Sequence, residues 1–332
     1  MLISLVIPAH NEALQIPTTI ESLQSVLPAE YSYEFIFIDD GSEDQTWAVL
    51  KAAQKEEPRL KLLRLSRNFG KESALLAGLD AVHPKSSALI VLDCDLQFPP
   101  QYIAKMLELW QSGYEIVAGR KITRQKESFF SRLKAKGFYR FFRRLSGYDL
   151  NNATDFQLWD RKVLEAWYGL SERISFFRGL SLWLGFKRCS FDFEVAEREH
   201  GESSWNFFSL LRLSLDAITG FSAKILLIIP ILAGVFWLFF LILGIQTLYH
   251  FFNGQAATGF TTVILLQLLI GGAILFSISL IAIYIARLFI EVKGRPRYLL
   301  SELSFDQDRF SLHNRSLAEQ EKELQNGSKK IF

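Results

Sequence analysis

Two acidic residues, Asp93 and Asp95, follow a run that is apolar at every position from 88 to 92. Such a run predicts a strand covered on both faces of a parallel sheet, because a half-exposed strand would alternate polar and apolar residues. Carboxylates two residues apart on an extended chain point to the same side and repel each other unless a cation lies nearby. Mg²⁺ and Mn²⁺ prefer oxygen ligands, and Gln97 could add an amide oxygen. This corner is therefore a candidate metal site, although Asp-x-Asp alone also occurs at ordinary loop ends.

The elements that must position these acids alternate along the first 120 residues. Strand patterns cover 2–7, 34–38, 60–65, 88–92 and 115–118, and helical patterns cover 18–26, 46–54, 72–81 and 100–111. This alternation predicts an α/β fold with right-handed β-α-β units and a mostly parallel sheet. Polar clusters follow the strands at 8–12, 39–42, 66–71, 93–95 and 119–120. Open sheets bind ligands at the carboxyl ends of their strands, so we expect these clusters to meet in one crevice.

The side chains of this predicted crevice suit a nucleotide. Acceptors for ring N–H groups and ribose hydroxyls are Glu12, Asp39, Asp40 and Asp93, and cations for phosphates are Arg67, Lys71 and Arg120. The sequence has no Gly-x-Gly-x-x-Gly after the first strand and no phosphate loop ending in Gly-Lys-Ser/Thr. A dinucleotide hydride carrier and a phosphate-loop ATPase are therefore disfavoured. A nucleotide whose diphosphate is held by a metal remains.

The C-terminal third is strongly apolar. No Asp, Glu, Lys or Arg occurs from Ile225 to Ala286, which leaves room for two membrane-spanning helices, 225–249 and 261–286, joined by a polar turn at 250–255. Basic residues flank both spans, so the positive-inside rule places both chain ends, including the segment 287–332, in the cytoplasm. The tail after Ser301 is polar, and we expect it to be disordered. A helical hairpin buried in a soluble protein is the alternative.

Two further segments predict contact with a membrane surface. Residues 128–146 form a basic, Phe-rich amphipathic pattern typical of an interfacial helix, and 206–224 have a similar pattern before the first span. A solvated helix packed on the domain is the alternative for 128–146. The first residues lack the features of a signal peptide, and two cysteines without metal spacing suit a reducing compartment. A net charge of +2 says little by itself, and we expect no nucleic-acid partner.

Six motifs in order, SLVIPAHNE, FIDDGSEDQT, RNFGKESALLAGLD, LDCDLQFPP, VAGR and TDFQLWDRKV, resemble the family-2 glycosyltransferases with a GT-A (Rossmann-like) fold. The resemblance extends to about Tyr298 and is greatest to polyprenyl-phosphate glycosyltransferases, such as the bactoprenol glucosyltransferases and dolichol-phosphate mannose synthase. It implies a GT-A catalytic domain over 1–205, followed by the juxtamembrane helix and the two spans. It also implies a homo-oligomer, for which a tetramer is one candidate by analogy.

The resemblance also implies a role for each matching residue. Nucleotide contacts are implied for Pro8, Ala9, Asn11, Glu12, Asp40 and Asp93, with the phosphate-facing Lys71 added from its charge. Asp95 and Gln97 match the metal position, and Asp155 matches the acid near the reacting sugar. Acceptor-phosphate contacts are implied for Arg120, Arg132 and Arg198, the last in REHGESSW, where Ser204 stands at a position that is commonly lysine.

Several of these residues have a structural alternative. Asn11 and Asp40 could cap the helices that follow them, because Asn and Asp are favoured at helix N-termini. Asp155 could pair with Arg161, and Arg132 could contact lipid headgroups. Trp159 and Trp167 are better explained as core residues than as acceptor contacts.

The expected activity is transfer of a hexose, glucose from UDP-glucose by first choice, to a polyprenyl phosphate with inversion. Asp95, Asp155, Arg120 and Arg132 would carry the reaction, with Mg²⁺ or Mn²⁺, on the cytoplasmic face of the inner or plasma membrane. Transfer of mannose from GDP-mannose and a processive polysaccharide synthase are enzymatic alternatives, although the latter carry a Gln-x-x-Arg-Trp motif that QLWDR does not fit. A membrane scaffold with a decayed site is the non-enzymatic alternative.

Overall fold

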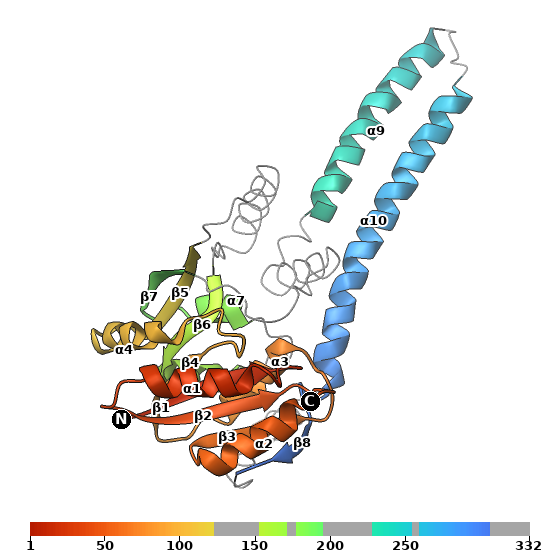
Figure 1. Cartoon of the computed structure of the whole chain (residues 1–332). Helices are drawn as coiled ribbons and strands as arrows, with labels where there is room; N and C mark the ends of the chain where they lie inside the picture. The colour runs from red at the N-terminus through yellow and green to blue at the C-terminus, as the bar shows by residue number, and fades with distance from the viewer. Residues whose placement is uncertain (123–152, 171–176, 195–227, 254–258, 306–332) are drawn as a thin grey trace, which may run out of the picture. The chain divides into compact units, whose positions relative to one another are not determined.

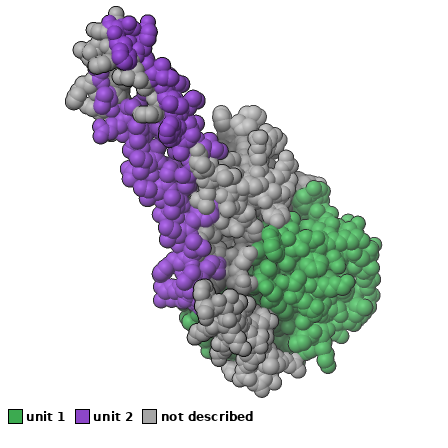
Figure 2. Space-filling model, turned by 180° about the vertical axis from the view of Figure 1, so that it is seen from behind, with its two compact units in different colours: residues 1–135, 150–204, 296–332 green, residues 136–149, 205–295 purple. Residues whose placement is uncertain are grey.

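The computed structural model describes residues 1–122, 153–170, 177–194, 228–253 and 259–305. The chain divides into two compact units (Figure 2). Unit 1 contains Met1–Ala135, Leu150–Ser204 and Pro296–Phe332, and unit 2 contains Lys136–Asp149 and Trp205–Arg295. The predicted helices at 128–146 and 206–224, together with Arg132 and Arg198, lie outside the described residues.

Unit 1 is built on one eight-stranded sheet with the order β7-β5-β6-β4-β1-β2-β3-β8 (Figure 1). Its centre consists of four parallel strands, β1 (Leu2–Ala9), β2 (Ser32–Asp39), β3 (Leu60–Leu65) and β4 (Ser86–Val91). They are joined by α1 (Ile16–Val26), α2 (Thr46–Glu56) and α3 (Lys71–Asp80). A short 3-10 turn, η1 (Pro100–Tyr102), and α4 (Ile103–Gln111) follow β4. The predicted β-α-β order of this half is confirmed, with boundaries that differ by a few residues.

The second half of the sheet departs from simple alternation. β5 (Ile116–Ile122) does not join β4, because β6 (Ala153–Asp160) is inserted between them and is antiparallel to both. β7 (Arg188–Glu194) lies parallel to β5 at the sheet edge. Two helices, α6 (Arg161–Tyr168) and α7 (Phe177–Trp183), connect β6 to β7. Four of the seven strand pairs are parallel, so the sheet is mostly parallel but mixed.

β8 (Leu300–Leu303) closes the opposite edge of the sheet by pairing antiparallel with β3. The prediction of disorder after Ser301 is therefore wrong for the next few residues. The Ser304 backbone N–H donates to the Leu62 carbonyl at 3.0 Å, and the Leu62 N–H donates to the Ser304 hydroxyl at 2.9 Å. The prediction relied on polar composition, but an edge strand can form from backbone hydrogen bonds to one neighbouring strand even when its side chains are polar.

The core of unit 1 is rich in aromatic side chains. Trp159 of β6 is fully buried and stacks on Phe177 of α7 with ring centroids 4.7 Å apart. Trp167 of α6 is also buried and lies 5.3 Å from Trp159. The prediction that these two tryptophans belong to the core is confirmed. This packing fixes α7 against β6, the strand that carries Asp155.

Unit 2 contains two long apolar helices, α9 (Ile228–Phe252) and α10 (Phe260–Lys293). They form a hairpin whose helices lie side by side (Figure 1). Within the described residues, one segment, Leu269–Lys293, is long and apolar enough to cross a membrane, with a mean hydropathy of 2.4; Ile231–Leu243 in α9 is apolar but shorter. α10 ends where Gly294 adopts a left-handed conformation (φ 64°), which closes the helix as glycine commonly does.

Candidate active site

A cluster of charged side chains, of which Asp155 is buried, lies where β4, β6 and α3 meet. The Lys71 ammonium, at the start of α3, is 2.6 Å from Asp93 Oδ1 and 2.8 Å from Asp155 Oδ2. Asp93 follows the end of β4, and Asp155 projects from β6 with 2% of its surface exposed. The structure therefore brings together three predicted site residues from separate parts of the sequence. One lysine is shared between two carboxylates that would otherwise repel each other.

Asp155 is also held by Arg178 of α7. The guanidinium donates two parallel hydrogen bonds, from Nε at 2.7 Å and from NH2 at 2.8 Å, to the two carboxylate oxygens. A bidentate pair of this kind fixes the orientation of a carboxylate as well as its charge. The expected alternative partner, Arg161, instead binds Glu165 at 2.9 Å, so that pairing is wrong. No motif or spacing in the sequence singles out Arg178, although it is the one cation of the otherwise uncharged helix α7.

These contacts set the charge state of the cluster. Burial alone would raise the pKa of Asp155, but the charges of Lys71 and Arg178 outweigh it and hold that pKa below its usual value. Burial also raises the pKa of Asp93, an effect that Lys71 opposes and that Asp155 reinforces. Asp155 is therefore a permanent anion near neutral pH, which is a poor proton acceptor but a rigid anchor for the groups around it.

The candidate metal corner is a tight turn rather than the extended chain that the sequence predicted. β4 ends at Val91, and the Gln97 backbone N–H donates to Asp95 Oδ1 at 3.1 Å. Leu96 within this turn has φ 55°, a conformation that is uncommon for a residue with a side chain. Among the described residues, the other non-glycine residue with positive φ is Asn11, which belongs to the same predicted site. Backbone strain of this kind tends to occur at functional sites.

The carboxylates of this corner fit a hard divalent cation. Asp93 Oδ1 is buried and accepts no hydrogen bond from any described residue, although it is in ion-pair contact with Lys71. Burial is the main cause of the raised pKa of Asp93, and the negative charges of Asp155 and Asp95 add to it. The described residues contain no group of three or more His, Cys, Asp or Glu side chains arranged for a metal. Mg²⁺ bound by one or two carboxylates and substrate phosphates needs no such group.

The predicted nucleoside loops contact one another across the ends of β1, β2 and β3. The Asp40 carboxylate, 3% exposed, accepts hydrogen bonds from the backbone N–H groups of Phe69 at 2.8 Å and Gly70 at 2.9 Å. Gly41, at φ 63°, packs so closely that a Cβ there would lie 2.3 Å from the Arg67 backbone carbon. The loops after β2 and β3 are therefore held together at the carboxyl ends of the central strands, where Asp93 also lies.

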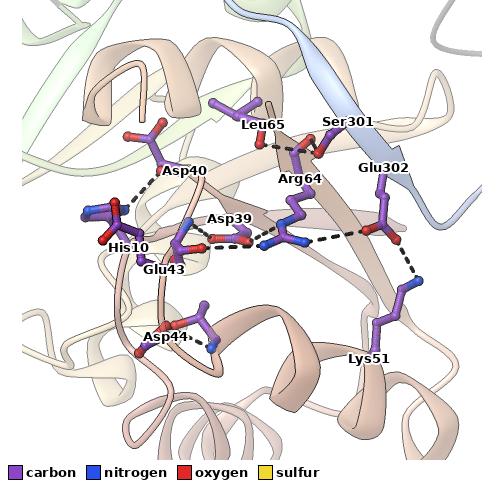
Figure 3. A network of polar contacts seen from close by, with 12 residues as sticks. His10, Asp39, Asp40, Glu43, Asp44, Lys51, Arg64, Leu65, Ser301 and Glu302 are labelled. Atoms are coloured by element: carbon purple, nitrogen blue, oxygen red, sulfur yellow. Dashed lines mark hydrogen bonds and ion pairs between the residues drawn. The ribbon is translucent and has the colours of Figure 1, made fainter. Parts of the chain in front are cut away.

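The Asn11 backbone N–H donates to the Ser42 hydroxyl at 2.9 Å, and the Asn11 side-chain oxygen accepts from the Glu43 N–H at 3.0 Å. His10 joins the same group by a contact of 3.0 Å between its Nδ1 and the Asp40 carbonyl (Figure 3). Neither Asn11 nor Asp40 caps the helix that follows it, because the N-cap residues of α1 and α2 are Gln15 and Gln45. The capping alternative is wrong, and both side chains serve instead to join loops.

Of the other predicted residues, Pro8, Ala9 and Glu12 lie at or after the end of β1, whereas Arg120 lies on β5. Pro8 and Ala9 form the end of β1, and the Glu12 backbone N–H donates to the Thr46 hydroxyl at 2.9 Å. Arg120 lies on β5 and forms an ion pair with Asp192 of β7, where its side chain is 55% exposed. The structure thus joins Asp93, Lys71 and Asp155 directly, whereas the described contact of Arg120 is outside that cluster.

Comparisons with known proteins identify the family to which the chain belongs. The chain matches the family described as Glycosyl transferase family 2 over residues 4–167. A bactoprenol glucosyl transferase of Shigella phage SfII is 34% identical over 310 residues, which cover 91% of this chain and 98% of the phage protein. The uncharacterized glycosyltransferase YkcC of Bacillus subtilis is 36% identical over 308 residues, covering 90% of this chain and 93% of that protein.

Among solved structures, glucosyl-3-phosphoglycerate synthase from Mycobacterium tuberculosis, in complex with Mn²⁺, UDP and phosphoglyceric acid, aligns with a TM-score of 0.48. Its sequence identity is 17%, and the alignment covers 66% of this chain and 76% of that one. The sequence relatives decide the assignment, because they match across nearly the full length of both proteins. The chain belongs to glycosyltransferase family 2 and is a glycosyltransferase.

Proposed function

We propose that this enzyme transfers glucose from UDP-glucose to the phosphate of a polyprenyl phosphate, with inversion, at the cytoplasmic face of a membrane. The observation that carries this proposal is the alignment with the phage bactoprenol glucosyl transferase, which covers 98% of that protein. An alignment of this length includes more than the nucleotide-binding half. From this relative we carry over to the present chain the transferred sugar, glucose, and the acceptor, a polyprenyl phosphate.

Departure of the nucleoside diphosphate is the hard step, because a phosphate acceptor is already an anion at neutral pH. Asp93 and Asp95 are the residues that would hold Mg²⁺ or Mn²⁺, with Gln97 beside them. A bound divalent ion supplies a Lewis acid that neutralises charge on the leaving diphosphate. Lys71, whose side chain is 42% exposed, places a further positive charge next to Asp93. The cluster therefore suits a ligand that brings both a metal and negative charge.

Asp155 acts in this proposal as a fixed anion that orients the sugar or the acceptor. Its two oxygens are occupied by Arg178 and Lys71, and these charges keep its pKa low. A carboxylate in this state has little tendency to take a proton from an acceptor. The single displacement that we propose needs no general base, because the attacking phosphate oxygen already carries charge.

The apolar helices would hold the enzyme at the bilayer that contains the acceptor lipid. α9 and α10 have 25 and 34 residues, and about 20 residues cross a hydrocarbon core. Trp237, Ile245 and Leu275 are each about two-thirds exposed, which water would disfavour and lipid would accept. Ser277 and Ser279 donate to carbonyls four residues earlier in α10, so their hydroxyls are satisfied within the helix. Two spans with both ends in the cytoplasm are the arrangement that we propose.

Replacement of Asp95 by asparagine tests the metal assignment. Asp95→Asn should reduce transfer from UDP-glucose to polyprenyl phosphate by at least about 100-fold, because several kcal/mol of leaving-group stabilisation would be lost. The measurement is formation of the polyprenyl-phosphate sugar by detergent-solubilised protein with Mn²⁺, with GDP-mannose tested in parallel. Glu165→Gln, which removes an exposed carboxylate on α6, is the matched control and should retain activity. Undiminished transfer by Asp95→Asn would refute the metal assignment. Faster transfer by the wild-type enzyme from GDP-mannose than from UDP-glucose would refute the choice of donor.

The proposed topology is testable by labelling Asn253, at the end of α9. In a background of Cys94→Ser and Cys189→Ser, Asn253→Cys should react with a membrane-impermeant maleimide added outside intact cells, because the turn would face away from the cytoplasm. A cysteine at exposed Glu43 of the catalytic unit should react only after the cells are opened. Equal protection of both positions until lysis would contradict a two-span arrangement.

Glu72 gives a prediction about pH. Burial and the charge of Asp155 raise its pKa from 4.5 to about 7, while it accepts a hydrogen bond from the Phe177 N–H at 2.8 Å. A raised carboxyl pKa stabilises the fold fully below about pH 4.5, and this contribution is lost as pH rises through about 7. Glu72→Gln keeps an acceptor without the charge and should therefore raise the melting temperature at pH 8 by about 5 °C, for a gain of about 1–3 kcal/mol.

The gain from Glu72→Gln should shrink toward zero at pH 4.5, where the wild-type carboxyl is protonated. Thermal melts of the two proteins between pH 4.5 and pH 8.5 give the comparison. Glu165→Gln, at an exposed position, should show no such trend. A melting-temperature difference that does not change with pH would mean that Glu72 is not held protonated in the folded enzyme.

A further inference from the structure

A line of charges crosses three strands and ends at the predicted nucleoside loop (Figure 3). Asp39 of β2 is the register partner of Arg64 on β3, and Arg64 is the register partner of Glu302 on β8. Directly opposite residues on neighbouring strands project to the same face of a sheet, so the three side chains are adjacent. Arg64 Nε lies 3.2 Å from Asp39 Oδ2, and Arg64 NH1 lies 3.6 Å from Glu302 Oε1.

The inner end of this line shapes the loop after β2. Asp39 is fully buried, and its Oδ1 accepts a hydrogen bond from the Ser42 N–H at 2.9 Å. Arg64 also reaches the Ser42 carbonyl, with NH2 at 3.5 Å. The same guanidinium thus contacts both ends of the turn that carries Asp40. Asp39 and Ser42 are thus joined both by their direct hydrogen bond and by their contacts with Arg64.

The outer end is anchored by β8, the first strand after α10 in the sequence. Ser301 donates to the carbonyl of Arg64 at 3.2 Å, and the Ser66 N–H donates to the Leu299 carbonyl at 2.8 Å. Tyr298 donates to Asp80 at 2.6 Å at the end of α3. Glu302 is therefore held at a fixed position beside Arg64. Its second partner is Lys51 of α2, at 2.8 Å.

We propose that β8 is a positioning element of the donor site, and that Glu302 acts through Arg64 to hold the 39–42 turn in the conformation that binds the nucleotide. This inference rests on the proposed function, because it assumes that the turn binds a nucleotide. It makes the segment that follows the apolar helices a part of the donor site. Arg64 and Glu302 are positioning residues in this proposal, and neither contacts the donor.

The test is calorimetric titration of detergent-solubilised full-length enzyme with UDP and Mn²⁺. Glu302→Gln should raise the Kd for UDP about two- to fivefold, the range expected for a partly exposed charge pair. Arg64→Gln should raise it by about tenfold, because buried Asp39 then loses its cation. Lys51→Gln removes the Lys51–Glu302 ion pair but keeps both members of the Arg64–Glu302 pair, and it should leave the Kd unchanged.

A double-mutant cycle separates positioning from general stability. Because Glu302 acts through Arg64, adding Glu302→Gln to Arg64→Gln should raise the Kd no further. In transfer assays Glu302→Gln should raise the donor KM, with kcat and the melting temperature unchanged. The inference is overturned if Glu302→Gln leaves the Kd unchanged, if its effect persists fully in the Arg64→Gln background, or if the melting temperature falls by more than about 5 °C. Failure of the wild-type enzyme to bind UDP would instead contradict the proposed function.

Discussion

The shared contact of the Lys71 ammonium with Asp93 and Asp155 is the interaction on which the site depends. It joins the end of the central strand β4 to β6, a strand inserted against the parallel order of the sheet. Arg178 completes the cluster from α7, whose position is set by aromatic packing on β6. Removing Lys71 would take away the described cation partner of Asp93, and removing Asp155 would take away that of Arg178, which is more costly than losing an exposed pair. The cluster therefore fixes four elements relative to one another where the chemistry is proposed to occur.

This arrangement also shifts the pKa values of neighbouring acids in opposite directions. Asp155 has two cations and a lowered pKa, whereas Asp93 is partly buried with a raised pKa, and Glu72 lies near the same cluster. Under the proposed function, a further cation and an anionic ligand would both enter this cluster. The nucleoside loops add a second rigid region, because the Asp40 carboxylate and Asn11 bind backbone groups of neighbouring loops. The two regions lie on the same side of the sheet, at the carboxyl ends of the central strands, because those strands are parallel.

Much of the fold could be predicted from the sequence, because apolar runs followed by helical patterns specify β-α-β units locally. The polar residues after β1, β2, β3 and β4 could be assigned to the site for the same reason. β6, Arg178 and β8 could not, because their places are set by long-range contacts: β6 enters antiparallel between two strands, and β8 pairs with β3, which lies far earlier in the sequence. Arg178 lies in an apolar helix where periodicity gives no sign of a charge partner. The strand that was expected to extend through Asp93 and Asp95 ends at Val91, and a turn with left-handed Leu96 follows.

A structure of the enzyme with UDP-glucose and Mn²⁺, with the metal identified by its anomalous scattering, would test the central claim most directly. The expected result is a manganese ion bound by the Asp95 carboxylate beside Asp93 and in contact with the diphosphate, with Asp155 still paired to Arg178. A bound nucleotide whose diphosphate lies away from this corner, or an Asp95 that contacts only its own chain while the nucleotide is in place, would contradict it.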